Sequence, residues 1–241
     1  MTFDSKQVEE LNNEYKDKSP LDVIKWALDN IHPKIALASS FGAEDVVVID
    51  MLMKVNPDAR IFTLDTGRLN QETYDVMDEI KSKYNKKLEV MFPDTQEIED
   101  MVREHGMNLF YKGQENRKLC CGVRKVHPLK KILGTLDGWI TGIRADQTQN
   151  RGDAAIFEID KVFGGILKVN PIISWTWQQT LEYIKDNNVP YNKLHDKGYP
   201  SIGCEPCTRA IKEGEDLRAG RWWWESSQKE CGLHETKAVA N

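Results

Sequence analysis

The chain has 241 residues, of which 40% are hydrophobic, and its 33 lysines and arginines against 38 aspartates and glutamates give a net charge of −5. This length suits one large domain, or a domain with a small appendage, and it can bury a core. The acidic balance argues against a nucleic-acid-binding protein. No apolar run approaches the ~20 residues of a membrane span, and the first residues lack the order of a signal peptide. We therefore expect a cytoplasmic protein that binds neither membranes nor nucleic acid.

Alternating apolar runs and amphipathic segments predict an α/β fold. Residues 5–31 predict two helices, because Pro20 suits the first turn of a helix and Ser19 its cap. Strands and helices then alternate, which predicts a parallel sheet with helices on both faces. The expected strands are 34–38, 60–64, 88–92 and 139–141, the expected helices are 46–53, 70–84, 95–104 and 121–133, and a peripheral hairpin is expected over 155–159 and 166–169, before a helix within 171–187.

Polar turns follow two of the expected strands. Ser39-Ser40-Phe41-Gly42 ends the first, and Asp65-Thr66-Gly67-Arg68 ends the second. Parallel sheets bind ligands beyond the carboxyl ends of their strands, and a strand–turn–helix unit offers N–H groups to a phosphate. The first turn lacks the lysine of a Walker-type loop, and the same pattern also occurs in turns that bind nothing. The two turns together favour a site at this edge.

Four of the five cysteines form two pairs, Cys120–Cys121 and Cys204–Cys207. The odd total argues against a closed set of disulfides, and cysteines of a cytosolic protein more often bind metal or carry out chemistry. Zinc and a [4Fe-4S] cluster both accept four thiolates. Adjacent cysteines suit a tetrahedral ion poorly, so the spacing favours the cluster and leaves zinc as the alternative.

Cys231 stands apart in a polar stretch of about 20 residues that is too short to fold alone and reads as a mobile tail. Lys229 and His234 lie near it in the sequence. A thiol beside basic groups can be a nucleophile, and the alternative is a surface cysteine without a role. We predict one α/β domain over residues 1–215, with its N-terminal helices at 5–31, and a tail over 216–241.

These features together resemble the adenylyl-sulfate reductases of the assimilatory sulfate pathway, within the phosphoadenylyl-sulfate reductase family. The resemblance extends from about Lys34 to His234. It implies an adenine nucleotide alpha hydrolase-like domain of the PP-loop type, and the four paired cysteines resemble the cluster-bearing branch. The motifs that carry it are 39–45, 65–68, 120–126, 139–144, the Cys204–Cys207 pair and 229–234, of which the last is the most specific.

The resemblance implies a two-step reduction of adenylyl sulfate to sulfite and AMP, with phosphoadenylyl sulfate as a second candidate substrate. Cys231 would attack the sulfate sulfur and become an S-sulfocysteine, which thioredoxin or glutaredoxin would then release. One [4Fe-4S] cluster per chain would be held by Cys120, Cys121, Cys204 and Cys207, with Lys125 coupling it to the sulfate and His234 helping to position the anion. The implied substrate-binding residues are Ser39, Ser40, Gly67, Gly142, Arg144, Arg151, Arg218 and Arg221.

Two other functions are compatible with parts of the pattern. An adenylating ATPase of the same fold typically has a Ser-Gly-Gly-x-Asp-Ser loop, which the turn starting at Ser40 matches poorly. A zinc-stabilised adaptor for nucleic acid or protein would not explain the acidic net charge or the single tail cysteine. A homo-oligomer is compatible with the sequence.

Overall fold

The computed structural model describes residues 3–147 and 154–225. The α-helices are α1 (Ser5–Tyr15), α2 (Pro20–Ile31), α3 (Ala43–Val55), α4 (Gln71–Tyr84), α5 (Thr95–His105), α6 (Gln114–Cys121), α7 (His127–Leu133) and α8 (Trp177–Asp186). The strands are β1 (Ile35–Ala38), β2 (Arg60–Leu64), β3 (Glu89–Met91), β4 (Gly138–Ile140), β5 (Phe157–Asp160) and β6 (Ile166–Val169). Short 3₁₀ and π turns lie at η1 (Leu109–Lys112), η2 (Gly122–Val126), η3 (Ala145–Gln147), η5 (His195–Lys197) and η6 (Glu205–Cys207).

Within these described residues, six strands form one sheet in the order β3-β2-β1-β4-β6-β5. β1 pairs in parallel with both β2 and β4, and β4 pairs in parallel with β6. β5 runs antiparallel to β6 at the edge. The predicted α/β fold class is confirmed, but the expected peripheral hairpin is an integral part of the sheet because β6 pairs with β4.

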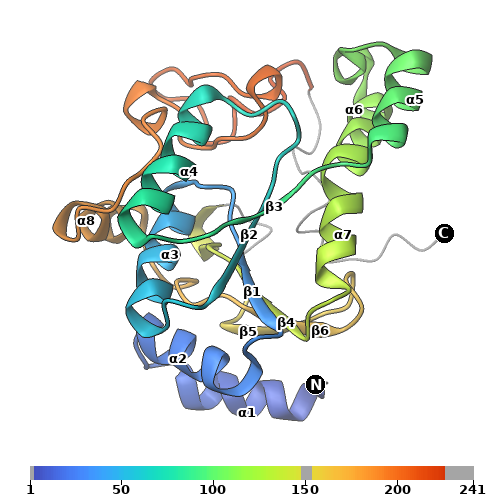
Figure 1. Ribbon diagram of the computed structural model, residues 1–241. Helices are drawn as coiled ribbons and strands as arrows, with labels where there is room; N and C mark the ends of the chain where they lie inside the picture. Colours follow the sequence, from blue (N-terminus) through green and yellow to red (C-terminus); the bar gives the residue numbers. More distant parts are fainter. Residues whose placement is uncertain (1–2, 148–153, 226–241) are drawn as a thin grey trace. The chain divides into compact units, whose positions relative to one another are not determined.

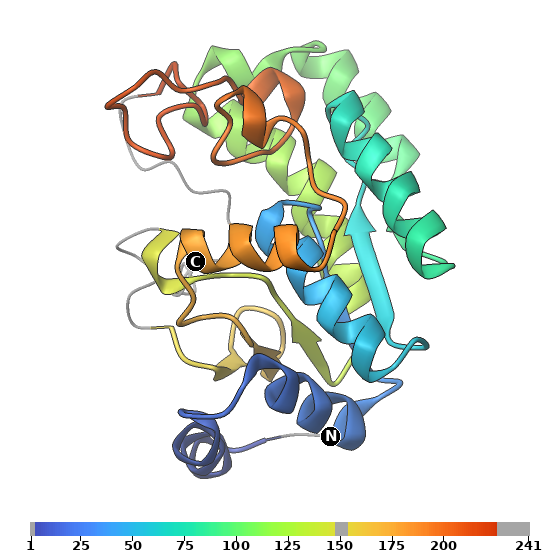
Figure 2. The same ribbon diagram turned by 90° about the vertical axis from the view of Figure 1, so that its left-hand side faces the viewer.

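The chain divides into two compact units, which we describe separately. The first contains the described parts of Met1–Thr63, Glu72–Glu89 and Leu133–Asn192, and the second those of Leu64–Gln71, Val90–Ile132 and Lys193–Asn241. The first unit holds most of the sheet, and α3, α4 and α8 lie together on one side of it (Figure 1). In the turned view α8 lies in front of α3 (Figure 2).

The strands of the first unit have a fully buried centre, since the exposed fraction is 0% at Ile35, Leu37, Ile61 and Ile140. A strand that is covered on both faces reads as a continuous apolar run, which is how these strands appear in the sequence. The buried sheet therefore provides a rigid base for the turns at its carboxyl edge.

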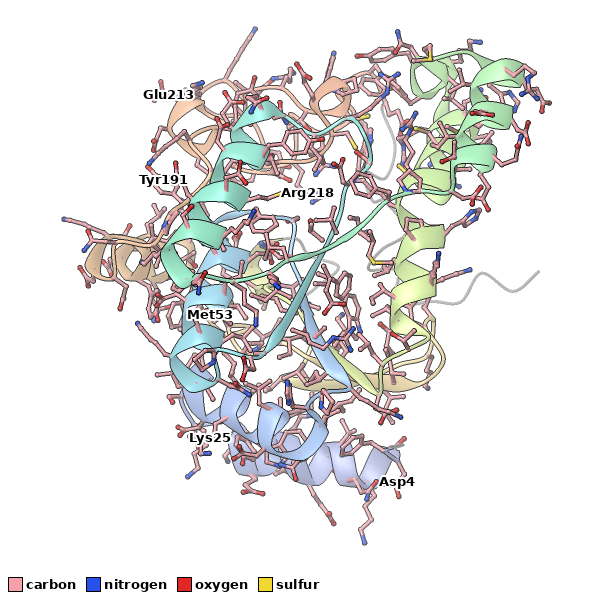
Figure 3. The ribbon with its side chains drawn as sticks, in the orientation of Figure 1. Asp4, Lys25, Met53, Tyr191, Glu213 and Arg218 are labelled. Atoms are coloured by element: carbon pink, nitrogen blue, oxygen red, sulfur yellow. The ribbon has the colours of Figure 1, made fainter. Side chains whose placement is uncertain are left out.

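The N-terminal helices begin where their capping residues require. Asp4 (Figure 3) and Ser19 each accept a hydrogen bond from the backbone three residues on and complete a capping box. Pro20 occupies the first turn of α2. Both signals can be recognised locally, which explains why this part of the prediction is confirmed.

The cysteine-bearing helix differs from the prediction. It begins at Gln114, not at Cys121, and the paired cysteines end α6. A π turn, η2, follows over Gly122–Val126 before α7 starts. The expectation that the cysteines open a helix was therefore wrong. The wider π turn changes the direction of the side chains after Cys121, a feature that is frequent at functional sites.

Across residues 3–147 and 154–225, none of the helices combines the length and the apolar character needed to cross a bilayer.

Candidate functional site

In the first unit, the turn after β1 is held in a strained conformation. Phe41 is fully buried and has a φ of 58°, in the left-handed region that a bulky residue rarely adopts. The Ser39 hydroxyl accepts a hydrogen bond from the Phe41 N–H at 3.1 Å. Such strain persists only where the surroundings impose it, and it concentrates at functional sites. The turn predicted at Ser39 and Ser40 is thus held in a defined conformation by its surroundings.

Asp45 occupies the polar groups of this turn. Its carboxylate accepts hydrogen bonds from the Ser40 N–H at 2.5 Å and the Ser40 hydroxyl at 2.7 Å. Asp45 lies in the first turn of α3, together with Glu44. Ser40 therefore already binds an anionic group, an internal carboxylate, in the place where a substrate contact was predicted.

The turn after β4 lies against the start of α3. A Cβ atom at Gly142 would come within 2.4 Å of the Asp45 carboxylate and 3.0 Å of its backbone nitrogen. Only glycine allows this approach, so the predicted need for Gly142 has a steric reason. β1 and β4 are the strands between which the chain reverses its direction of winding, and that switch point is where open α/β sheets bind ligands.

Arg144 is buried in the same turn and is held by carboxylates. Its guanidinium donates to Glu44 at 3.0 Å from Nε and 2.8 Å from Nη2, and it also pairs with Asp146. It lies over the Trp177 ring at 5.6 Å. The structure therefore brings Ser39, Ser40, Gly142 and Arg144 to the carboxyl edge of one sheet, and adds Glu44 and Asp45, which the sequence analysis missed.

The second unit contains a cavity that all four paired cysteines line. It has about 310 Å³ of empty space, part of it open to solvent. The cysteines are free thiols, with Cys120 and Cys207 buried. The other lining residues are Arg68, Phe110, Arg117, Arg124, Lys125 and Pro206. The structure thus brings together two cysteine pairs that are distant in the sequence. Between Cys121 and Cys204 lie 82 residues (204 − 121 − 1).

The thiols of the cavity influence one another. Burial, together with the charges of Cys204 and Cys121, raises the pKa of Cys207 to about 12. Burial also raises the pKa of Cys204, but Lys125 and a hydrogen bond from Thr66 outweigh it and leave that pKa below its usual value. The Thr66 hydroxyl and the Cys204 sulfur are 3.2 Å apart. The pKa of Cys204 is thus shifted in the opposite direction from that of Cys207.

The donor set can be compared with what a thiolate-bound group needs. In the part of the chain that the structure describes, no three Cys, His, Asp or Glu side chains form a group that could hold a metal ion. The four cysteines line one cavity, with Arg68, Arg117, Arg124 and Lys125 beside them. Four thiolates are the ligand set of a [4Fe-4S] cluster and also of structural zinc, and neighbouring cations suit a bound group that carries negative charge.

Buried cations surround the cysteines. Arg124 donates to the Thr66 carbonyl at 2.6 Å and lies 3.6 Å from a Cβ built on Gly67, whose φ is 68°. Arg221 is buried, contacts the Ser201 hydroxyl at 3.3 Å and fills the space beside Gly203, where a Cβ would meet it at 2.4 Å. Gly67, Lys125 and Arg221 thus belong to this unit, as does Arg218, whose N–H donates to Asp216 at 2.8 Å.

Arg68, Arg117 and Gly203 were not among the predicted site residues. Arg117 precedes Cys120 and Cys121 by three and four positions, a spacing that places side chains on one face of a helix. That signal was available in the sequence once α6 was known to start at Gln114. Gly203 had no signal, because its role is to leave room for a side chain 18 positions away (221 − 203).

Three predicted residues, Arg151, Cys231 and His234, lie outside the described residues. Their roles stay predictions.

Comparison with known proteins places these features in context. A family model described as phosphoadenosine phosphosulfate reductase domain matches residues 34–210. An adenosine 5'-phosphosulfate reductase from Burkholderia cepacia is 44% identical over 90% of this chain and 86% of its own, and one from Allochromatium vinosum is 45% identical over 83% and 78%. A crystal structure of a phosphoadenylyl-sulfate reductase from Candida auris, a phosphate complex, superposes with a TM-score of 0.74 at 29% identity over 88% of this chain and 99% of that one. An FMN adenylyltransferase from Candida glabrata shares the fold alone, with a TM-score of 0.53 at 13% identity over 92% of this chain and 74% of that one.

Proposed function

Because the chain belongs to the phosphoadenosine phosphosulfate reductase family, we propose that it reduces adenylyl sulfate to sulfite and AMP in assimilatory sulfate reduction. The family match over residues 34–210 confirms the resemblance found in the sequence. The chain is accordingly an oxidoreductase that acts on a sulfonucleotide. Relatives at 44% and 45% identity that are named for adenosine 5'-phosphosulfate support the choice of substrate.

The observation that carries the proposal is the single cavity lined by Cys120, Cys121, Cys204 and Cys207. We assign one [4Fe-4S] cluster per chain to these cysteines. When bound, the cluster would join the two cysteine pairs and add its charge to the cavity, as a structural and electrostatic group. The two electrons of the reaction would come from a dithiol protein, because a disulfide is a two-electron product.

Lys125 supports the sulfate-binding part of the proposal. It lines the same cavity as the four cysteines, and its positive charge helps to hold the pKa of Cys204 below its usual value. A sulfate group carries negative charge that repels an attacking thiolate, and fixed cations reduce that repulsion as charge develops. We therefore propose that Lys125, Arg218 and Arg221 bind the sulfate group, and that Gly67 allows the substrate to approach the backbone closely.

Ser39, Ser40, Gly142 and Arg144 are proposed to bind the nucleotide. Their position at the switch point of the sheet supports this assignment. In the structure Ser40 binds Asp45, and Arg144 binds Glu44 and Asp146. A nucleotide phosphate at either residue must therefore compete with carboxylates, which favours a ligand of limited negative charge over a triphosphate.

Cys231 is the proposed nucleophile. Its thiolate attacks the sulfur of the sulfate group, the bond from that sulfur to the phosphate oxygen breaks, and AMP leaves with the electron pair. The product is an S-sulfocysteine. A thiolate of thioredoxin or glutaredoxin attacks the Cys231 sulfur and sulfite leaves, and the second thiol of the partner then releases Cys231 as a disulfide forms within the partner. His234 and Arg151 are proposed to bind the anion.

The test is purification without oxygen, followed by assays of iron and sulfide and by mass spectrometry after mixing with adenylyl sulfate. We expect iron and sulfide in equal amounts, and a mass gain of one SO₃ group on the peptide that holds Cys231. Zinc without sulfide would contradict the cluster, and a gain on another cysteine would contradict the assignment of the nucleophile. Pyrophosphate release from ATP would favour an adenylating enzyme instead.

A further inference from the structure

Arg117 joins the cysteine cavity to the end of the described chain. It is 1% exposed, lines the cavity and lies on the same helix as Cys120 and Cys121. Its Nε donates to both carboxylate oxygens of Glu225, at 2.8 and 3.0 Å. The Glu225 side chain is itself only 6% exposed in this ion pair. A buried pair of this kind fixes both partners, because separating them would leave a charge without compensation.

The same guanidinium lies beside a cysteine of the cavity. Arg117 and Cys121 line that cavity together and are four positions apart on α6. Burial opposes the charge of Arg117, but Glu225 and Cys121 outweigh burial and raise the pKa of the guanidinium. One side chain thus pairs with Glu225 and adjoins Cys121.

Trp222 provides a second connection between the cysteine cavity and Glu225. Two guanidinium groups lie over its ring, that of Arg117 at 4.4 Å and that of Arg221 at 4.6 Å from the ring centroid. Its backbone has a φ of 42°, in the left-handed region, and is held by hydrogen bonds to the Cys207 carbonyl at 3.2 Å and from Glu225 to its own carbonyl at 2.9 Å. Strain of this kind needs contacts that impose it, and Arg117 supplies one of them through the Trp222 ring.

We propose that Arg117 is a positioning residue that couples the cysteine cavity to Trp222 and Glu225, at the end of the described chain, through its place beside Cys121 and its contacts with those two residues. The inference rests on the proposed function, in which Cys231 is the nucleophile. Cys231 lies six positions after Glu225 in the sequence (231 − 225). A cluster that fixes Cys121 also fixes Glu225, and by linkage the anchored Glu225 favours the loaded cavity.

Hydrogen exchange measured by mass spectrometry tests the coupling without using activity. The proteins are the full chain with and without iron, as wild type, Glu225→Gln and Glu215→Gln. Glu215 is the matched control, because it forms a similar two-oxygen pair with Arg209, at 2.8 and 2.9 Å, at a more exposed place in the same unit. We expect loss of iron to speed exchange at residues 222–225 in the wild type and in Glu215→Gln. In Glu225→Gln the exchange should be fast already, and loss of iron should add little.

Additive effects of iron loss and of Glu225→Gln would overturn the coupling, since independent contributions add. The same conclusion would follow if Glu225→Gln exchanged like the wild type. Glu225→Asp keeps the charge and should restore part of the protection, which separates loss of the ion pair from general damage. These readouts need no sulfur chemistry, so they test the inference even if the proposed nucleophile is wrong.

Single-turnover experiments test the positioning role. We expect Glu225→Gln to slow formation of S-sulfocysteine by about tenfold to a hundredfold, with the Kd for adenylyl sulfate unchanged. Glu225→Asp should lose less of the rate than Glu225→Gln does, and the control Glu215→Gln should keep the wild-type rate. An unchanged rate in Glu225→Gln, or a rate lost only through a weaker Kd, would overturn the role. Absence of any SO₃ gain in the wild type would instead contradict the proposed function.

Discussion

Lys125 lines the cysteine cavity, and among the neighbouring charges its own does most to lower the pKa of Cys204. It follows the paired cysteines within the π turn η2, so its direction depends on that turn. Lys130, five residues later, is exposed on α7. Two lysines close in the sequence therefore differ in their surroundings, which allows a matched comparison.

We predict that Lys125→Ala slows formation of the S-sulfocysteine by about a hundredfold or more, because a cation aimed at developing charge is removed. Lys130→Ala should retain the wild-type rate. The measurement is single-turnover mass spectrometry of the peptide that holds Cys231, with iron content determined for each variant. Equal rates for Lys125→Ala and the wild type would contradict the assigned role of Lys125.

At the scale of elements, Asp50 ties three helices of the first unit together. From α3, its carboxylate accepts hydrogen bonds from Tyr84 of α4 and Tyr183 of α8, both at 2.7 Å. Lys54 of α3 pairs with it at 2.7 Å. Burial alone would raise the pKa of Asp50, but these three partners outweigh it and hold that pKa below its usual value. The charged carboxylate thus stabilises the arrangement of the helices.

We predict that Asp50→Asn lowers the free energy of unfolding by about 2–4 kcal/mol near pH 7, because it weakens a buried network around Lys54. A depressed pKa contributes stability that is present above the ordinary aspartate value and disappears as the pH falls through the folded value. The difference between wild type and variant should therefore shrink below about pH 4. Urea unfolding followed by circular dichroism across this range measures it.

Asp29→Asn is the control for this prediction. Asp29 pairs with Lys25 at 2.7 Å on α2, where both side chains are exposed. Lys25 is labelled in Figure 3. Exposed pairs contribute about 0–1 kcal/mol, so this variant should unfold almost as the wild type does at every pH. A difference for Asp50→Asn that stays constant down to pH 3 would show that the carboxylate's charge is not the stabilising feature.

At the scale of the whole molecule, the two units place different chemistry in different parts of the chain. The first unit contains the strained turn at Phe41 and the buried Arg144, and the second contains the four cysteines and their cations. The predicted boundary near residue 215, with one domain before it, stays a prediction. The four proposed iron–sulfur ligands all lie in the second unit, so loss of the proposed cluster should act first on that unit.

We predict that Cys207→Ser abolishes iron binding and speeds hydrogen exchange across α6 and η6, while β1 and β4 keep their protection. Regions of a protein open with separate free energies, and the proposed cluster would cross-link only segments of the second unit, which contains all four cysteines. Cys231→Ser should keep its iron and exchange like the wild type. Equal acceleration in both units of Cys207→Ser would contradict this separation.

Much of the fold could be read from local patterns. β2 begins and ends where its apolar run does, and α2 starts at the Ser19–Pro20 cap. Both are decided by neighbours in the sequence. The start of α6 was not predicted, because the π turn after Cys121 interrupts the helical period on which the prediction of a helix over 121–133 relied. The joining of β6 to β4 was missed because strand pairing depends on residues that are distant in the chain.

The sequence by itself determined the family and the α/β class, and it singled out Cys120, Cys121, Cys204 and Cys207 as candidate cluster ligands. Cysteine spacing and short motifs can be recognised before the packing of the chain is known. Only the tertiary structure decided what surrounds them. It put the carboxylate of Asp45 on Ser40, set Arg221 in the space left by Gly203 and paired Arg117 with Glu225. These contacts depend on burial and on long-range packing, so no local pattern of residue types could have specified them.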